Sequence, residues 1–250
     1  MQSLFKTCIF LLLLFVNDVQ SQEEPTINSQ LWINYYPSFY LKEKIQVTGE
    51  VGYRTILEDD SYRLLYIRPS INYLYDETFE INGGLGMWYE FNKNSSDRFE
   101  IRPWQGIRIN WPNLKKLNLN RWQVNQWFRV EERFSFFTQD NWKTSLDVRA
   151  RYKLSGKLDL CIDCINPKFA IPFYMELFLS LSNISEIYNN QGRFGVGLDY
   201  FYKKNLQFEF LFHWQSSKIE QEDPLSVSDY IFQLKIKHKL NHNPFRKKKK

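Results

Sequence analysis

Beyond its first sixteen residues, the chain contains no apolar run of the roughly 20 residues that a membrane-spanning helix needs. The mean hydropathy is low, at −0.49, and no helical period of apolar residues appears after residue 21. These absences exclude a helical membrane protein. They do not exclude a membrane β-barrel, because only every second residue of a barrel strand is apolar.

Cysteine is scarce, with three residues in the chain. Cys161 and Cys164 form a C-x-x-C pair, and in an exported protein such a pair most often forms a disulfide. Zinc would require two further ligands, and thioredoxin-type chemistry would require a helix after the first cysteine. We therefore predict a loop-tightening disulfide between Cys161 and Cys164 and no metal site, with free thiols or a redox or metal function as the alternatives.

Sequence signals of catalysis are also missing. No nucleophile motif of the G-x-S-x-G kind is present. Of the three histidines, only His213 falls on the polar face of an expected strand, where a structural role is the simpler interpretation. We predict that the protein is not an enzyme, has no catalytic residues and uses no cofactor.

Neither sign of charge dominates the chain. Lys and Arg number 33 against 28 Asp and Glu, and the net charge of +5 comes from the basic run at residues 246–250. This balance gives no nucleic-acid signal, so nucleic acid is not an expected partner. Residues 241–250 are predicted to be a solvated basic tail, with contact to anionic lipid headgroups as the alternative.

The first 21 residues have the pattern of a secretory signal peptide. Lys6 precedes the apolar run at residues 8–16, and Val19, Gln20 and Ser21 precede the expected cleavage site. Residues 22–30 are polar and are expected to be a loose lead-in. The sequence therefore predicts an exported protein.

Aromatic residues are abundant, at 18% of the chain, and favour strands and interfacial belts. In residues 98–111, one face is apolar with Gln105 as its single exception, while the other carries Glu100, Arg102 and Arg108. This period-two alternation predicts a strand with one apolar and one charged face. The same alternation recurs in eleven segments, at residues 31–41, 44–56, 62–74, 78–91, 98–111, 121–136, 142–154, 168–182, 191–203, 205–216 and 228–240.

The segments predict an all-β fold with one domain at residues 31–240, a single antiparallel up-and-down transmembrane β-barrel. Connections between the segments alternate between tight turns and longer polar loops, as in bacterial outer-membrane barrels. Such barrels have even strand numbers. We therefore predict about twelve strands, with residues 155–168 hiding a short one, or ten if the first segment stays outside the sheet.

The direction of each face decides between two kinds of barrel. In a membrane barrel the apolar face meets lipid and the charged face lines the lumen, whereas in a soluble barrel the faces reverse. Most of the segments have about 11 to 14 residues, which is long enough for tilted strands to cross a bilayer. Aromatic residues also lie toward the ends of the apolar faces, as interfacial girdles do, namely Tyr53, Tyr73, Tyr89, Phe91, Trp111, Trp122, Phe134, Phe136, Tyr200, Tyr202 and Tyr230.

Several motifs resemble one family. The most specific is Glu-Ile-Arg-Pro-Trp-Gln-Gly at residues 100–106, followed by Phe-Arg-Val-Glu-Glu-Arg-Phe at 128–134, Val-Arg-Ala-Arg-Tyr at 148–152 and Gln-Gly-Arg-Phe at 191–194. Over residues 30–240 the chain resembles an uncharacterised family of Bacteroidota outer-membrane barrels, domain-of-unknown-function family 2490. The resemblance implies an outer-membrane β-barrel with no known activity.

We expect an integral outer-membrane protein of a Gram-negative bacterium, acting as a narrow porin-like channel or as a structural or surface element. Its expected partners are outer-membrane lipid, the barrel assembly machinery and small solutes. The alternatives are a soluble periplasmic barrel that binds a lipid or other apolar ligand, and an outer-membrane lipid hydrolase or acyltransferase. The candidate site is a lumen-facing charge ladder that fixes the lumen width, formed by Glu100, Arg102, Trp104, Arg129, Glu131, Arg133, Arg149, Arg151, Glu176 and Arg193. The wider set expected in the lumen adds Glu50, Arg54, Arg68, Arg108, Asp147, Asp199, Glu209, Lys235 and Lys237.

Overall fold

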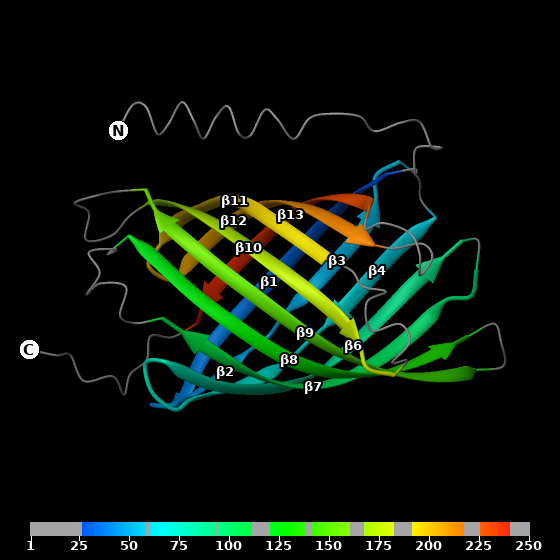
Figure 1. Ribbon diagram of the computed structural model, residues 1–250, viewed down its shortest axis with the longest axis horizontal. Helices are drawn as coiled ribbons and strands as arrows, with labels where there is room; N and C mark the ends of the chain where they lie inside the picture. The colour runs from blue at the N-terminus through cyan, green and yellow to red at the C-terminus, as the bar shows by residue number, and fades with distance from the viewer. Residues whose placement is uncertain are drawn as a thin grey trace, which may run out of the picture.

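The computed structural model is a closed β-barrel (Figure 1). It describes residues 27–58, 61–93, 95–111, 121–138, 142–160, 168–182, 192–217 and 226–240. In these ranges the regular structure consists of strands, and no helix there is long and apolar enough to span a membrane. The all-β barrel predicted from the sequence is confirmed.

Thirteen strands are present in the described part of the chain. They are β1 (Asn28–Lys42), β2 (Ile45–Thr48), β3 (Val51–Ile56), β4 (Tyr62–Ile67), β5 (Ser70–Leu74), β6 (Phe79–Asn92), β7 (Arg98–Asn110), β8 (Trp122–Phe137), β9 (Lys143–Asp159), β10 (Phe169–Ser180), β11 (Gly192–Lys203), β12 (Leu206–Ser217) and β13 (Ser226–Lys239).

Two crossings of the barrel wall are each divided between two strands. β2 and β3 both pair with β1, and β4 and β5 both pair with β6. At the break, Glu50 and Arg68 exchange backbone hydrogen bonds of 3.1 and 2.7 Å, and Pro69, which has no N–H to donate, follows. The barrel therefore has eleven crossings, which coincide with the eleven predicted segments. The predicted totals of twelve or ten are wrong: the first segment joins the sheet as β1, and residues 155–159 belong to β9, which pairs directly with β10.

The barrel closes through a parallel pair. β1 lies beside β13 from Asn28↔Asp229 to Ser38↔Lys239, while every other described pair is antiparallel. The prediction of a wholly antiparallel barrel is therefore wrong at this seam. An up-and-down sheet with an odd number of crossings brings its first and last strands together in the same direction, so the parallel pair follows from the number eleven.

Burial in this barrel is the reverse of burial in a soluble protein. Large apolar side chains are exposed along the outer face of the wall, including Ile33, Leu65, Ile81, Ile107 and Phe210. Among the predicted girdle residues, six are among the exposed large side chains: Tyr73, Phe91, Trp111, Trp122, Phe134 and Tyr202. The inner face carries most of the buried charged and amide side chains. The apolar face is thus outside, as the membrane prediction requires and as a soluble barrel holding an apolar ligand does not.

The polar exception on the outer face has a partner. Gln105 of β7 is exposed, and its Nε2 donates a 3.1 Å hydrogen bond to Oε1 of Glu132 on β8. Glu132 likewise stands on the outer face, because it alternates with the inward-facing Glu131 and Arg133. The break in the apolar pattern is therefore one hydrogen-bonded pair and not a shift in strand register.

Candidate functional site: the charged lumen

The inside of the barrel, the lumen, holds a cavity of about 590 Å³. Its described lining contains nine arginines and six lysines but only three carboxylates, those of Glu50, Glu90 and Glu176. Other carboxylates of the inner face, including Glu100, Glu131 and Glu209, contact basic side chains that line the cavity. All three carboxylates of the lining accept contacts from arginine as well.

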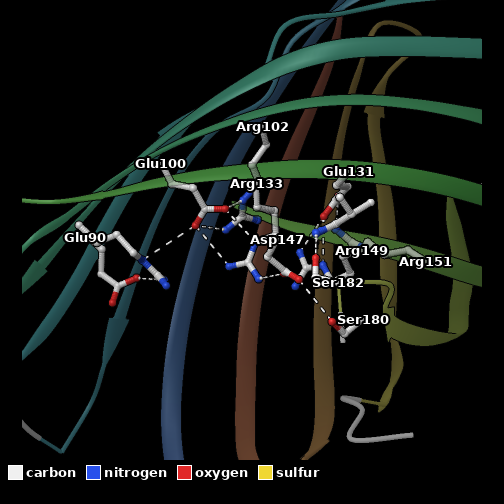
Figure 2. A network of polar contacts seen from close by, with 12 residues as sticks. Glu90, Glu100, Arg102, Glu131, Arg133, Asp147, Arg149, Arg151, Ser180 and Ser182 are labelled. Atoms are coloured by element: carbon white, nitrogen blue, oxygen red, sulfur yellow. Dashed lines mark hydrogen bonds and ion pairs between the residues drawn. The ribbon is translucent and has the colours of Figure 1, made fainter. Parts of the chain in front are cut away.

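Three ladder residues form a balanced network with Asp147 of the wider set and with Glu90 and Arg98, which neither predicted set contains (Figure 2). Glu100, 1% exposed, accepts from Arg102 and from Arg133, whose Nε lies 2.8 Å from Oε1. Arg133 also reaches Asp147 at 3.2 Å, and Arg98 joins Glu100, at 3.9 Å, to Glu90, at 2.5 Å. The network therefore contains three guanidinium groups and three carboxylates. We refer to these six residues as the balanced cluster.

A second group, on β8 to β11, has more cations than anions. Glu131 lies 2.6, 2.7 and 2.9 Å from guanidinium nitrogens of Arg129, Arg149 and Arg151. Arg151 also contacts Glu176 at 2.5 Å, and Glu176 lies 3.5 Å from Arg193. We call these six residues the cationic cluster: Arg129, Glu131, Arg149, Arg151, Glu176 and Arg193. The strand register brings them together, since Arg129 lies opposite Arg151, Glu131 opposite Arg149, and Glu176 opposite Arg193.

The wider predicted set forms smaller groups. Glu50 accepts from Arg68 and from the side chains of Asn34, Tyr36 and Tyr66, and Glu209 accepts from Lys235 at 2.8 Å and from Lys237. Arg108 contacts Glu80, a residue absent from the predicted set, at 3.0 Å. Arg54 and Asp199 have no ion pair among the described residues.

Aromatic rings stack with the arginines inside the barrel, and only one of them, Trp104, is among the residues predicted to face the lumen. The guanidinium of Arg54 lies 3.8 Å from the ring centre of Trp32, and that of Arg102 lies 4.0 Å from Trp88. Arg129 lies 5.2 Å from Trp104 and 4.5 Å from Trp127. Such contacts are attractive at these distances. The alternation in the sequence contains this signal, because Trp88 is in phase with Glu90, Trp127 with Arg129 and Trp32 with the inward-facing Asn34.

Glycines on the inner face leave space for these rings. A Cβ atom added to Gly86 would lie 2.0 Å from the ring of Trp88, and one added to Gly52 would lie 2.3 Å from Tyr66. Any larger side chain at either position would displace a ring from the lumen wall. The glycines therefore set where the aromatic side chains can lie.

His213 occupies a structural position. It is fully buried and lies 2.5 Å from the hydroxyl of Tyr174 and 2.8 Å from Oε1 of Gln233. Its ring also packs near Trp32. Both ring nitrogens of His213 are thus engaged by side chains of neighbouring strands, as a structural role requires.

Some predicted features fall outside the described residues: the signal peptide at residues 1–21, the disulfide between Cys161 and Cys164, and the tail at residues 241–250. Within the described ranges, no group of three or more His, Cys, Asp or Glu side chains is arranged to hold a metal ion. β1 begins at Asn28, inside the stretch predicted as the lead-in.

Comparison with known proteins assigns the chain to a family. Residues 29–225 match the family described as "Protein of unknown function (DUF2490)", and the chain belongs to it. No curated protein matches the sequence. Among solved structures, the chain is similar to the KdgM porin, with 16% identity over 72% of this chain and 81% of that one and a TM-score of 0.41. It is similar also to the NanC porin, with 10% identity over 74% and 86% and a TM-score of 0.41. Scores below 0.5 are too low to carry an argument about function.

Proposed function

We propose that this protein is an integral outer-membrane β-barrel that lets small solutes pass through a narrow, charge-lined lumen. The observation that carries the proposal is the inverted burial. An apolar outer face suits lipid, and a polar interior that still holds a cavity of about 590 Å³ suits water and small solutes.

Strand length and closure support the membrane location. The undivided strands have 12 to 17 residues, and a tilted strand needs only about 9 to 11 to cross the bilayer core. Every strand has neighbours on both sides, so no sheet edge is left unpaired in lipid.

The ladder residues have a proposed role in this function. Cross-strand pairs within the balanced and cationic clusters hold long side chains against the wall and thereby fix the width of the passage. A barrel whose side chains fill the lumen completely, with a structural or surface role, is the second candidate, because the same pairs occupy much of the interior.

The first test is gel mobility of the outer-membrane fraction in mild detergent, with and without heating, followed by conductance in planar bilayers. We expect a band that shifts on heating and discrete channel openings. A chain ending at residue 225, which lacks β13, is the control and should give neither. Soluble protein without a heat shift would refute the membrane barrel. A heat shift without conductance would favour the structural role.

A further inference from the structure

The cationic cluster carries an uncompensated positive charge. Its four guanidinium groups face two carboxylates, an excess of two, and no other Asp or Glu among the described residues lies within 4 Å of them. Arginine remains charged inside proteins, and a buried charge without a counter-charge is costly. By contrast, the balanced cluster contains as many carboxylates as guanidinium groups.

Within the cationic cluster, Arg129 is the side chain with unused hydrogen-bonding capacity. Its side chain is 1% exposed, yet Nε, Nη1 and Nη2 have no hydrogen-bond acceptor among the described residues. The 2.6 Å contact to Glu131 is an ion pair without hydrogen-bond geometry, and Glu131 is shared with two other arginines. The cross-strand neighbour on β7 is Gly106, which has no side chain to supply an acceptor.

The surroundings of Arg129 favour an anion that enters from the lumen. Arg129 lines the cavity, and Trp104 and Trp127 pack beside its guanidinium. A planar guanidinium with free N–H groups matches carboxylate and phosphate oxygens in geometry as well as charge. The side chains that line the cavity are mostly basic, and the cationic cluster keeps an excess of two positive charges after its ion pairs are counted, which favours anions at the site.

We infer that Arg129, with Arg149, Arg151 and Arg193 around it, forms a binding site for small oxyanions, so that the solutes admitted by the lumen are carboxylates or phosphates. The inference rests on the proposed passage of small solutes and names their chemical class. Carboxylate and phosphate share the chemistry that the site recognises, and separate probes distinguish them.

The test is calorimetric titration of the folded, heat-modifiable barrel in detergent with citrate and, separately, with inorganic phosphate at constant ionic strength. At least one probe should bind the wild-type protein saturably. Arg129→Gln should weaken that binding by about tenfold or more, since it removes a charged hydrogen-bond donor. Arg98→Gln, in the balanced cluster, is the matched control and should stay within about twofold of wild type. Emission from Trp104 and Trp127, beside Arg129, should change on binding.

Three results would overturn the site: no binding of either probe, equal binding by Arg129→Gln, or an equal loss in Arg98→Gln. Bilayer measurements separate this failure from failure of the proposed function. A barrel that conducts without binding either probe keeps the channel and loses the anion site. A barrel that binds citrate or phosphate through Arg129 without conducting keeps the site and loses the channel.

Discussion

At the scale of single residues, most of the buried charged side chains in the lumen contact a side chain of opposite charge. Removing an ion from water costs several kcal/mol, and the cost is recovered only when geometry and additional hydrogen bonds are good. Glu100 meets this condition, because both of its oxygens accept from arginine. Such a carboxylate contributes to the stability of the folded barrel mainly because its arginine partners would otherwise be buried without a counter-charge.

We therefore predict that Glu100→Gln destabilises the folded barrel by about 3–5 kcal/mol, the usual effect of removing one partner from a buried ion pair. Arg98, Arg102 and Arg133 would then share only Glu90 and Asp147. Urea titration of the heat-modifiable band in lipid vesicles measures the change. Glu77→Gln, the same substitution in the exposed turn before β6, should stay within about 0.5 kcal/mol of wild type. Equal midpoints for the two variants would contradict a structural role for Glu100.

Strand parity makes the direction of most side chains predictable from the sequence, and it placed Glu100, Arg129 and Glu176 on one face. The pairing of those residues was not predictable, because it depends on register between strands that are distant in the chain. Arg133 meets Asp147 across β8 and β9, for example, only in the observed register. Of the aromatic rings in the lumen only Trp104 is among the predicted lumen residues, although Trp88 alternates in phase with Glu90, because the prediction of a lumen site rests on charged side chains.

At the scale of strands, the sequence predicted the positions of the strands better than their total number. All eleven segments coincide with crossings of the wall, including those divided at Gly49–Glu50 and at Arg68–Pro69. The even-number rule for bacterial barrels then led to the wrong totals of twelve and ten. An odd number of crossings requires the parallel contact of β1 with β13. This contact could not be predicted, because no local sequence pattern distinguishes a parallel from an antiparallel neighbour.

The seam can be tested by cross-linking. Ile33 lies opposite Leu234 in the parallel register, so we predict that cysteines at these two positions form a disulfide under mild oxidation. The background should carry Cys161→Ser and Cys164→Ser. Ile33→Cys with Phe210→Cys is the matched control, because Phe210 lies opposite Leu234 on β12, one strand farther from β1. Cross-linking in the control alone, or in neither protein, would contradict the parallel closure.

At the scale of the whole molecule, eleven crossings place the start of β1 and the end of β13 at opposite ends of the barrel. The strand ends that flank residues 57–61, 93–97, 138–142, 181–191 and 218–225 lie at the end of the barrel at which β1 begins. The strand ends that flank residues 111–121 and 160–168 lie at the opposite end, together with the tight turns at residues 43–44, 75–78 and 204–205. Because the tight turns of outer-membrane barrels face the periplasm, the start of β1 should lie on the outer side and the end of β13 on the inner side.

Surface labelling tests this orientation. Ser95 and Lys204 are both exposed, the first in the connection between β6 and β7 and the second in the tight turn between β11 and β12. In the background without Cys161 and Cys164, we predict that a cysteine at Ser95 reacts with a membrane-impermeant maleimide on intact cells. A cysteine at Lys204 should react only after the outer membrane is permeabilised, since the reagent cannot otherwise reach the periplasm. The reverse pattern would place the long connections inside, and equal labelling of both sites on intact cells would argue against a barrel that spans the membrane.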